Sequence, residues 1–214
     1  MTVAPAEKRD AKRPPQIALI PFLRRHTDLP ASEADWLERQ GRRRTLVRGE
    51  AFCTVGQIAH EWGFLEEGIL QVYGVQSDGA HATLDFMFPG HFAIAFEAAL
   101  QGTPSNVCFE AVTPCTLVAW PYAIHATALA HHPGWERLTL RMTEDAFLRK
   151  HQRFMSLRVQ TAEERYASLA QDLPPGWEQI PQHMLASFLD ITPQYLSRLK
   201  RDAASGSKER RHGS

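Results

Sequence analysis

The middle of the chain, residues 51–120, contains short apolar and β-branched runs separated by turn residues. Residues 77–79 read Ser-Asp-Gly, which predicts a hairpin turn because glycine tolerates the positive φ that such turns require. Pro89-Gly90 predicts a second turn. The predicted strands are residues 45–47, 63–65, 68–73, 82–87, 107–112 and 116–120, the second and third being neighbours. Short strands at regular spacing are typical of a sandwich or a barrel.

Helical patterns flank this region and interrupt it once. Residues 17–23 and 32–40 predict a short helical lead-in, in which Ser32 is the N-cap and Asp35 completes a loose capping box. The alanine-rich residues 93–100, which end just before Gly102, predict a short helix inserted between strands. The result is a β-roll interrupted by one helix.

A long helix begins at Pro133-Gly134. Leu140, Phe147 and Phe154 repeat along it every seven residues, which is the spacing of a two-stranded coiled seam. We therefore expect a dimer interface at these three residues; the alternative, that the repeat packs on the chain's own β-roll, stays open. A further helix over residues 159–173 ends at Pro174-Pro175-Gly176.

Residues 182–201 combine the features of a helix-turn-helix. Ala186 is small enough for a second helix to cross closely, and Asp190 stands where the turn needs left-handed backbone. Ile191 fills the corner, Thr192 is a helix N-cap, and Pro193 occupies the first helical position, where its missing N–H costs nothing. The alternative is an ordinary helical hairpin with a solvated charged face.

The second of these helices has a polar, basic surface once Leu196 and Leu199 face the core. Arginine can bind guanine bidentately, glutamine can bind adenine, and lysine and serine suit phosphates. The expected DNA-contacting residues are Thr192, Gln194, Tyr195, Ser197, Arg198, Lys200 and Arg201.

Charge is segregated along the chain although the formal net charge is zero. Residues 49–136 contain no lysine or arginine and nine acidic residues, so the flanks carry net +9 (24 − 15) and this stretch net −9. A basic module suits a polyanion and an acidic one avoids it. The segregation predicts two modules with different partners.

Composition places the chain among ordinary globular proteins, with 43% hydrophobic and 22% charged residues. No apolar run approaches the roughly 18 residues of a membrane span. The first 15 residues lack the apolar core of a secretory signal. We expect residues 1–15 and 205–214 to be disordered, the three cysteines to be free thiols, and the protein to be cytoplasmic.

The order of these parts resembles the Crp/Fnr family of bacterial transcription regulators. The resemblance spans residues 17–201 and is strongest in QHMLASFLDITPQYLSRLKR and in GFLEEGILQVYGVQSDGAHATLDFMFPGHF with LQGTPSNVCFEAV. It implies an α+β protein with a cyclic-nucleotide-binding-like sensor (residues 16–132), a dimerisation helix (133–157) and a helix-turn-helix domain (158–204). It also implies a non-enzymatic homodimer on a palindromic operator, with no cofactor and with RNA polymerase as a further partner to consider.

Two departures from the family pattern concern recognition. Arg198 falls where the family has a base-contacting arginine, but Gln194 replaces its usual glutamate, which puts the usual operator sequence in doubt. In the sensor, the family's phosphate-binding arginine position is Ser105, and its Gly-Glu pair falls on Ala95-Phe96. We therefore expect no binding of cyclic AMP or cyclic GMP in the usual way.

The ligand pocket, if one is present, is expected at Phe96, Glu97, Ser105 and Asn106. Arg137 or Arg141 could supply the missing positive charge from the long helix. Otherwise, the pocket is filled by its own side chains, with Phe92, Phe96 and Phe109 as the candidates, or takes a neutral or cationic ligand.

Two competing readings remain at this point. A small β-barrel can house a metal-dependent enzyme, for which the candidate ligands are His60, His81, His91, Glu61 and Asp85. The same fold can also serve as a haem or redox sensor.

Overall fold

The structure is a computed structural model that describes residues 14–209, except for the side chains of residues 170–172 and 203–209. Residues 1–13 and 210–214, which hold most of the two segments expected to be disordered, lie outside the described residues. Residues 205–209, also expected to be disordered, continue the last helix instead.

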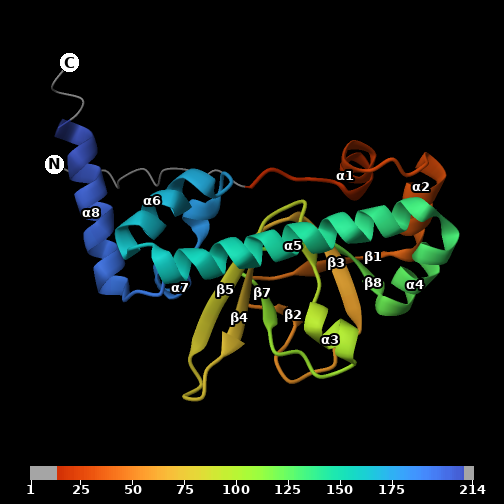
Figure 1. The fold of residues 1–214 in the computed structure, drawn as a ribbon, viewed down its shortest axis with the longest axis horizontal. Helices are drawn as coiled ribbons and strands as arrows, with labels where there is room; N and C mark the ends of the chain where they lie inside the picture. The colour runs from red at the N-terminus through yellow and green to blue at the C-terminus, as the bar shows by residue number, and fades with distance from the viewer. Residues whose placement is uncertain (1–13, 210–214) are drawn as a thin grey trace, which may run out of the picture.

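Eight strands form two antiparallel four-stranded sheets that face each other as a β-roll (Figure 1). The first sheet has the order β1-β8-β3-β6 and the second β2-β7-β4-β5. The strands are β1 (Arg42–Leu46), β2 (Ala51–Cys53), β3 (Glu61–Glu67), β4 (Leu70–Val75), β5 (His81–Met87), β6 (Phe92–Ala93), β7 (Cys108–Ala111) and β8 (Cys115–Pro121).

Helices surround the roll, and the longest runs across the whole molecule (Figure 1). The helices are α1 (Leu19–His26), α2 (Ala31–Gln40), α3 (Phe96–Gln101), α4 (Tyr122–His131), α5 (Pro133–Val159), α6 (Ala162–Asp172), α7 (Gln182–Leu189) and α8 (Pro193–Glu209), with a 3₁₀ turn at Trp177–Gln179. The sensor-like roll and the C-terminal helices α6–α8 lie along different parts of α5.

The apolar core has three parts because the central strands are buried on both faces. Along β3, Leu65 points into the roll, whereas Trp62 and Phe64 point outward beneath α1, α2, α4 and α5. The outer face of the second sheet packs on the C-terminal helices, where Ile69 and Phe86 share a cluster with buried leucines of α6–α8. The C-terminal helices are thus packed against the roll of their own chain.

The sequence-based expectations were wrong at several local points. The first strand begins at Arg42 because it pairs along its whole length with β8. Residues 63–65 and 68–73 are not neighbours: they belong to different sheets, and Gly68 (φ 95°) turns the chain between them. The inserted helix starts at Phe96 rather than at residue 93, because Phe92 and Ala93 pair with β3.

Two further differences concern the helices α2 and α4. Ser32 is not an N-cap: α2 begins at Ala31, so Ser32 lies inside the first turn, and no side chain caps that end. Helix α4 was not predicted at all, because alanine and other apolar residues occur around its whole circumference and leave no periodic pattern.

Candidate nucleic-acid interface

The turn between α7 and α8 has the geometry expected from the sequence. Asp190 is the only non-glycine residue with positive φ among the described residues, at φ 54° and ψ 49°. The Ile191 amide donates to the Ala186 carbonyl at 3.0 Å, and the Thr192 hydroxyl accepts from the Tyr195 amide at 3.2 Å. The turn, the corner and the cap at the start of α8 are therefore all satisfied by local bonds.

Helix α8 separates an apolar side from a polar side. Leu196 and Leu199 are buried, and Leu196 shares a core cluster with Leu169 of α6 and with the small side chain of Ala186 in α7. On the other side the predicted DNA-contacting residues Thr192, Gln194, Ser197, Arg198 and Arg201 are exposed, and Lys200 and Tyr195 are half-buried. The pair of helices thus presents a hydrogen-bonding face that carries positive charge.

Four contacts on this face were not foreseen from the sequence. The Tyr195 hydroxyl donates to the carboxylate of Glu163 in α6, and the Arg198 guanidinium lies 4.5 Å from the centre of the Tyr195 ring. The Gln182 amide nitrogen donates to the Ser197 hydroxyl and, at 3.3 Å, to the Pro193 carbonyl. The hydrogen bond from Tyr195 lowers the pKa of the Glu163 carboxyl. The contacts of Tyr195 with Glu163 and of Gln182 with Ser197 and Pro193 have no local pattern, because the partners come from different helices, whereas Arg198 and Tyr195 lie three residues apart in α8.

Helix α5 has an apolar stripe that no described part of the chain covers. Leu140, Phe147 and Phe154 are 58%, 66% and 60% exposed. Leu148 and Met155 are exposed too and widen the stripe. The alternative that the heptad repeat packs on its own β-roll is therefore wrong for these residues, and the roll is covered instead by the opposite face of α5, through Trp135 and Leu138.

The candidate ligand-pocket residues of the β-roll do not form one cluster. The Asn106 amide donates to the Glu97 carboxylate, and Ser105 is buried with its hydroxyl donating to the Val107 carbonyl at 2.8 Å. Phe96 lies elsewhere, on a cavity between α1 and α5. The polar side chains of Glu97, Ser105 and Asn106 thus already have hydrogen-bond partners, and none of them is a cation.

Of the three phenylalanines proposed to fill the roll, only Phe109 does so. Phe92 packs on the outer core beneath α1, and Phe96 lines the cavity outside the roll, so for these two the expectation was wrong.

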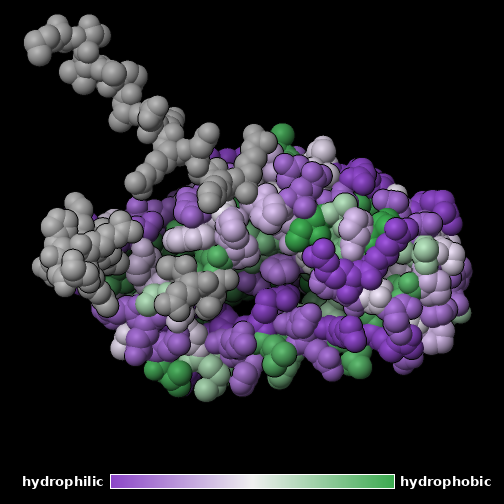
Figure 2. Space-filling model, turned by 90° about the horizontal axis from the view of Figure 1, so that it is seen from above, coloured by the Kyte–Doolittle hydropathy of each residue, from purple (hydrophilic) through white to green (hydrophobic). Residues whose placement is uncertain are grey.

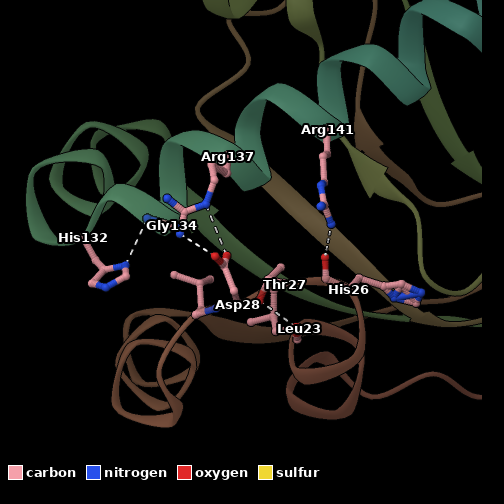
Figure 3. Close-up of polar contacts among 9 residues, drawn as sticks. Leu23, His26, Thr27, Asp28, His132, Gly134, Arg137 and Arg141 are labelled. Atoms are coloured by element: carbon pink, nitrogen blue, oxygen red, sulfur yellow. Dashed lines mark hydrogen bonds and ion pairs between the residues drawn. The ribbon is translucent and has the colours of Figure 1, made fainter.

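Arg137 and Arg141 extend away from the roll, toward the segment that joins α1 to α2 (Figure 3). The Arg137 guanidinium forms an ion pair with Asp28 at 2.6 Å, and Arg141 donates to the His26 carbonyl at 2.9 Å. The hydrogen bond from Arg137 lowers the pKa of the Asp28 carboxyl. Both arginines are thus engaged outside the roll.

Comparison with known proteins connects this geometry to a family. Residues 43–132 match the family model of the cyclic nucleotide-binding domain. FixK2 from Bradyrhizobium japonicum superimposes with a TM-score of 0.68 at 16% identity, over 78% of this chain and 86% of that one. The c-di-GMP-responsive global regulator CLP of Xanthomonas campestris gives 0.67 at 16% identity, over 83% and 93%.

A protein from Eubacterium rectale described as a transcriptional regulator of the Crp/Fnr family gives a TM-score of 0.66 at 14% identity, over 84% of this chain and 85% of that one. No curated protein sequence matches the chain. The chain has the fold of the Crp/Fnr regulators. In this chain, α7 and α8 lie at one end of the molecule, and α5 runs along the β-roll that matches the domain model (Figure 1).

The histidines considered as metal ligands are dispersed in this fold. His81 stacks on Tyr73, His60 is exposed, and His91 accepts from the Phe88 amide at 3.2 Å. Burial, helped by the charge of Arg149, lowers the pKa of His91 to about 4. Among the described residues, no three His, Cys, Asp or Glu side chains are grouped so that they could hold a metal ion.

The roll also contains the three cysteines and several ion pairs between its strands. The three cysteines are free, and burial raises the pKa of the Cys115 thiol to about 12. Arg42 pairs with Glu61 at 2.8 Å, and Arg43 pairs with the buried carboxylate of Glu66. These arginines of the basic flank bind the acidic stretch of the same chain, so the charge segregation does not separate two modules as cleanly as the sequence implied.

No helix of the described part is long and apolar enough to cross a membrane.

Proposed function

We propose that this chain is a homodimeric, sequence-specific DNA-binding transcription regulator of the Crp/Fnr type, with α7 and α8 as its helix-turn-helix. The observation that carries the proposal is the exposed face of α8, in which Gln194, Arg198 and Arg201 project beyond a helix that is anchored by Leu196 and Leu199. A recognition helix presents such residues to base edges in the major groove.

The contacts around Arg198 favour specific recognition over general affinity for polyanions. Its guanidinium lies over the Tyr195 ring, and Tyr195 is in turn bonded to Glu163, so the arginine is oriented before DNA arrives. An oriented side chain loses less conformational entropy when it binds. Thr192, Ser197 and Lys200 flank this group and suit phosphate contacts.

The α5 stripe supports the dimer. Leu140, Phe147 and Phe154 lie one heptad apart on an exposed helix face, where a second copy of the same helix would bury them. A two-fold axis along α5 would place two α8 helices for a palindromic site with half-sites about one DNA turn apart.

Selection of bound sequences from random duplexes, followed by fluorescence anisotropy, tests the proposal. We expect a palindromic site, and we expect Arg198→Ala to cost about 1–3 kcal/mol and to relax one base-pair position, whereas Lys200→Ala weakens all sequences alike. Affinity should fall steeply with salt because phosphate contacts release counterions. If Arg198→Ala changes neither affinity nor preference, α8 is not the recognition helix.

We further propose that the β-roll does not take cyclic AMP or cyclic GMP in the family's usual way. Transfer of a phosphate anion into a partly closed barrel is costly unless a cation meets it. Ser105 stands at the arginine position with its hydroxyl already bonded, and Arg137 and Arg141 are engaged with Asp28 and the His26 carbonyl. Isothermal titration with each nucleotide checks this, and micromolar binding would overturn it.

A further inference from the structure

A cavity of about 490 Å³ lies outside the β-roll, between α1, α5 and the segment that leads from β6 into α3. Figure 2 looks onto this side of the molecule and shows a hollow among hydrophilic side chains near its middle. The cavity is separate from Glu97, Ser105 and Asn106, none of which lines it. A ligand here would therefore not use the nucleotide-binding positions of the roll.

Positive charge predominates in the lining of this cavity. Arg25 comes from α1, Arg141 and Arg149 lie eight residues apart on α5, and Asp145 is the one carboxylate among the described residues that line it. A smaller cavity of about 320 Å³ shares Arg25 and Arg141 and continues toward the segment between α1 and α2. Three guanidiniums facing one space repel each other, and an anion between them would remove that repulsion.

Of these three arginines, Arg149 has a buried side-chain donor without a hydrogen-bond partner. Its Nε atom is buried and has no hydrogen-bond partner, although buried donors in proteins are nearly always paired. Asp85 interacts with it only electrostatically, and burial raises the pKa of the Asp85 carboxyl. Because Arg149 also lines the cavity, an acidic ligand group there would lie against an arginine that the protein itself pairs incompletely.

The rest of the wall is aromatic and apolar. The Phe22 ring stacks on His26 with centroids 4.4 Å apart and lies 5.9 Å from the Phe92 ring. Phe96 and Met142 complete the wall. Such a surface suits a flat apolar body, and pockets of this kind combine an apolar lining with a few placed polar groups.

We propose that this cavity binds a small organic anion in which an acidic group, a carboxylate or a phosphate monoester, is attached to a flat apolar body. The acidic group meets the guanidinium groups of Arg25, Arg141 and Arg149. The flat body lies against Phe22 and Phe96. The site is independent of the proposed DNA binding, because none of its residues belongs to α6, α7 or α8.

Isothermal titration of the full chain with matched probes tests the site. The probes are 2-naphthoate, 2-naphthyl phosphate and the neutral 2-naphthamide, in low-salt buffer free of phosphate. We expect one saturable site per protomer and an affinity for at least one anion about tenfold above that for naphthamide, since only the anions form ion pairs with the arginines, whereas the amide offers a neutral acceptor. The preferred anion identifies the acidic group.

Three variants distinguish anion binding in this cavity from non-specific attraction of anions to the protein surface. Arg149→Gln should reduce anion affinity by about tenfold and leave naphthamide unchanged. Arg158→Gln, which removes the same charge from an exposed position of α5 outside the cavity, should alter neither. Phe147→Glu should also alter neither, which excludes binding on the apolar stripe.

Other outcomes overturn the proposal. They are equal affinity for anions and amide, no saturable binding at millimolar probe, or an equal loss with Arg158→Gln. If Arg149→Gln fails to fold, Arg25→Gln replaces it, because Arg25 is exposed and has no hydrogen bond or ion pair to another described residue. Met142→Trp, which fills the cavity, should abolish the binding of all three probes in a protein that still melts cooperatively, and retained binding places the probes elsewhere.

Discussion

The two faces of α5 carry similar side chains in opposite surroundings. On the inward face Trp135 and Leu138 are buried, and the Trp135 indole donates to Glu33 at 2.9 Å. On the outward face Leu140, Phe147 and Phe154 are apolar but exposed to solvent. A surface helix normally confines its apolar residues to one side.

Residues on the inward face stabilise the folded protomer, whereas residues on the outward face are expected to hold two protomers together. The inward face should affect the free energy of unfolding of a single chain, and the outward face should affect the association of two chains. These two quantities can be measured separately if denaturation is followed at several protein concentrations.

The largest effect is expected from Trp135→Ala on the inward face. Loss of this buried ring should lower the free energy of unfolding by about 3–5 kcal/mol, because a cavity is left and the Glu33 carboxylate loses its donor. Urea denaturation at several concentrations measures it. Leu140→Ala is the control on the outward face, and an equal loss of protomer stability there would remove the distinction between the faces.

The next effect is expected from Phe147→Glu on the outward face. A charge in the centre of the proposed seam should raise the dimer dissociation constant by at least about hundredfold, while protomer stability changes by less than about 0.5 kcal/mol. Sedimentation velocity measures the association. Gln152→Glu places the same charge at another exposed position of α5 and should have no effect. A wild-type protein that is monomeric at micromolar concentration contradicts the prediction.

The features that the sequence predicted correctly depend on residues close together in the chain. Asp190 in left-handed backbone, the Thr192 cap and the heptad spacing of the α5 stripe are set by neighbours within a few residues. The glycine turn at Gly79 between β4 and β5 is of the same kind. Because such local patterns do not depend on contacts with distant segments, the sequence alone predicts these elements well.

The features that it missed depend on contacts between distant segments. The sequence does not indicate that Arg137 forms an ion pair with Asp28, or that Tyr195 donates to Glu163, because the two partners of each pair are far apart in the chain. The cavity of Arg25 and Arg149 exists only because α1 folds back on α5. Edges of strands were misplaced for the same reason, since pairing with β8 sets where β1 begins.

A smaller, pH-dependent effect is expected at His91, which lies beneath the inward face of α5. Its folded pKa is about 4, against 6.5 in the unfolded chain, because burial disfavours the charged ring. The unfolded chain therefore binds the proton more tightly, so stability is complete above about pH 6.5 and is lost as the pH falls toward 4, by about 2–3 kcal/mol.

The free energy of unfolding at pH 7 and at pH 4.5 measures this loss. His91→Asn keeps an acceptor near the Phe88 amide but does not titrate, so its stability should fall less over this range than that of the wild type. Equal slopes for the two proteins would mean that His91 titrates normally in the folded state.

The smallest effect is expected where α5 reaches the C-terminal helices. The Arg153 guanidinium lies 4.0 Å from the centre of the Phe188 ring of α7, and its pKa is lowered to about 10 by burial and by the charge of Arg165, so it stays charged at neutral pH. A partly desolvated contact of this kind contributes about 1 kcal/mol, which Arg153→Gln should remove.

Because α7 is also held to β5 by the bond from the Thr83 amide to the Ser187 hydroxyl, at 2.9 Å, the helix should loosen without detaching. Native-state hydrogen exchange should therefore show faster opening of α7 amides and unchanged protection in β3, a pattern that Arg158→Gln, further along the same helix, should not produce. Equal acceleration in β3 and α7 would instead mean that Arg153 stabilises the whole protomer, and the distinction between the roll-covering part of α5 and the part that holds α7 would be lost.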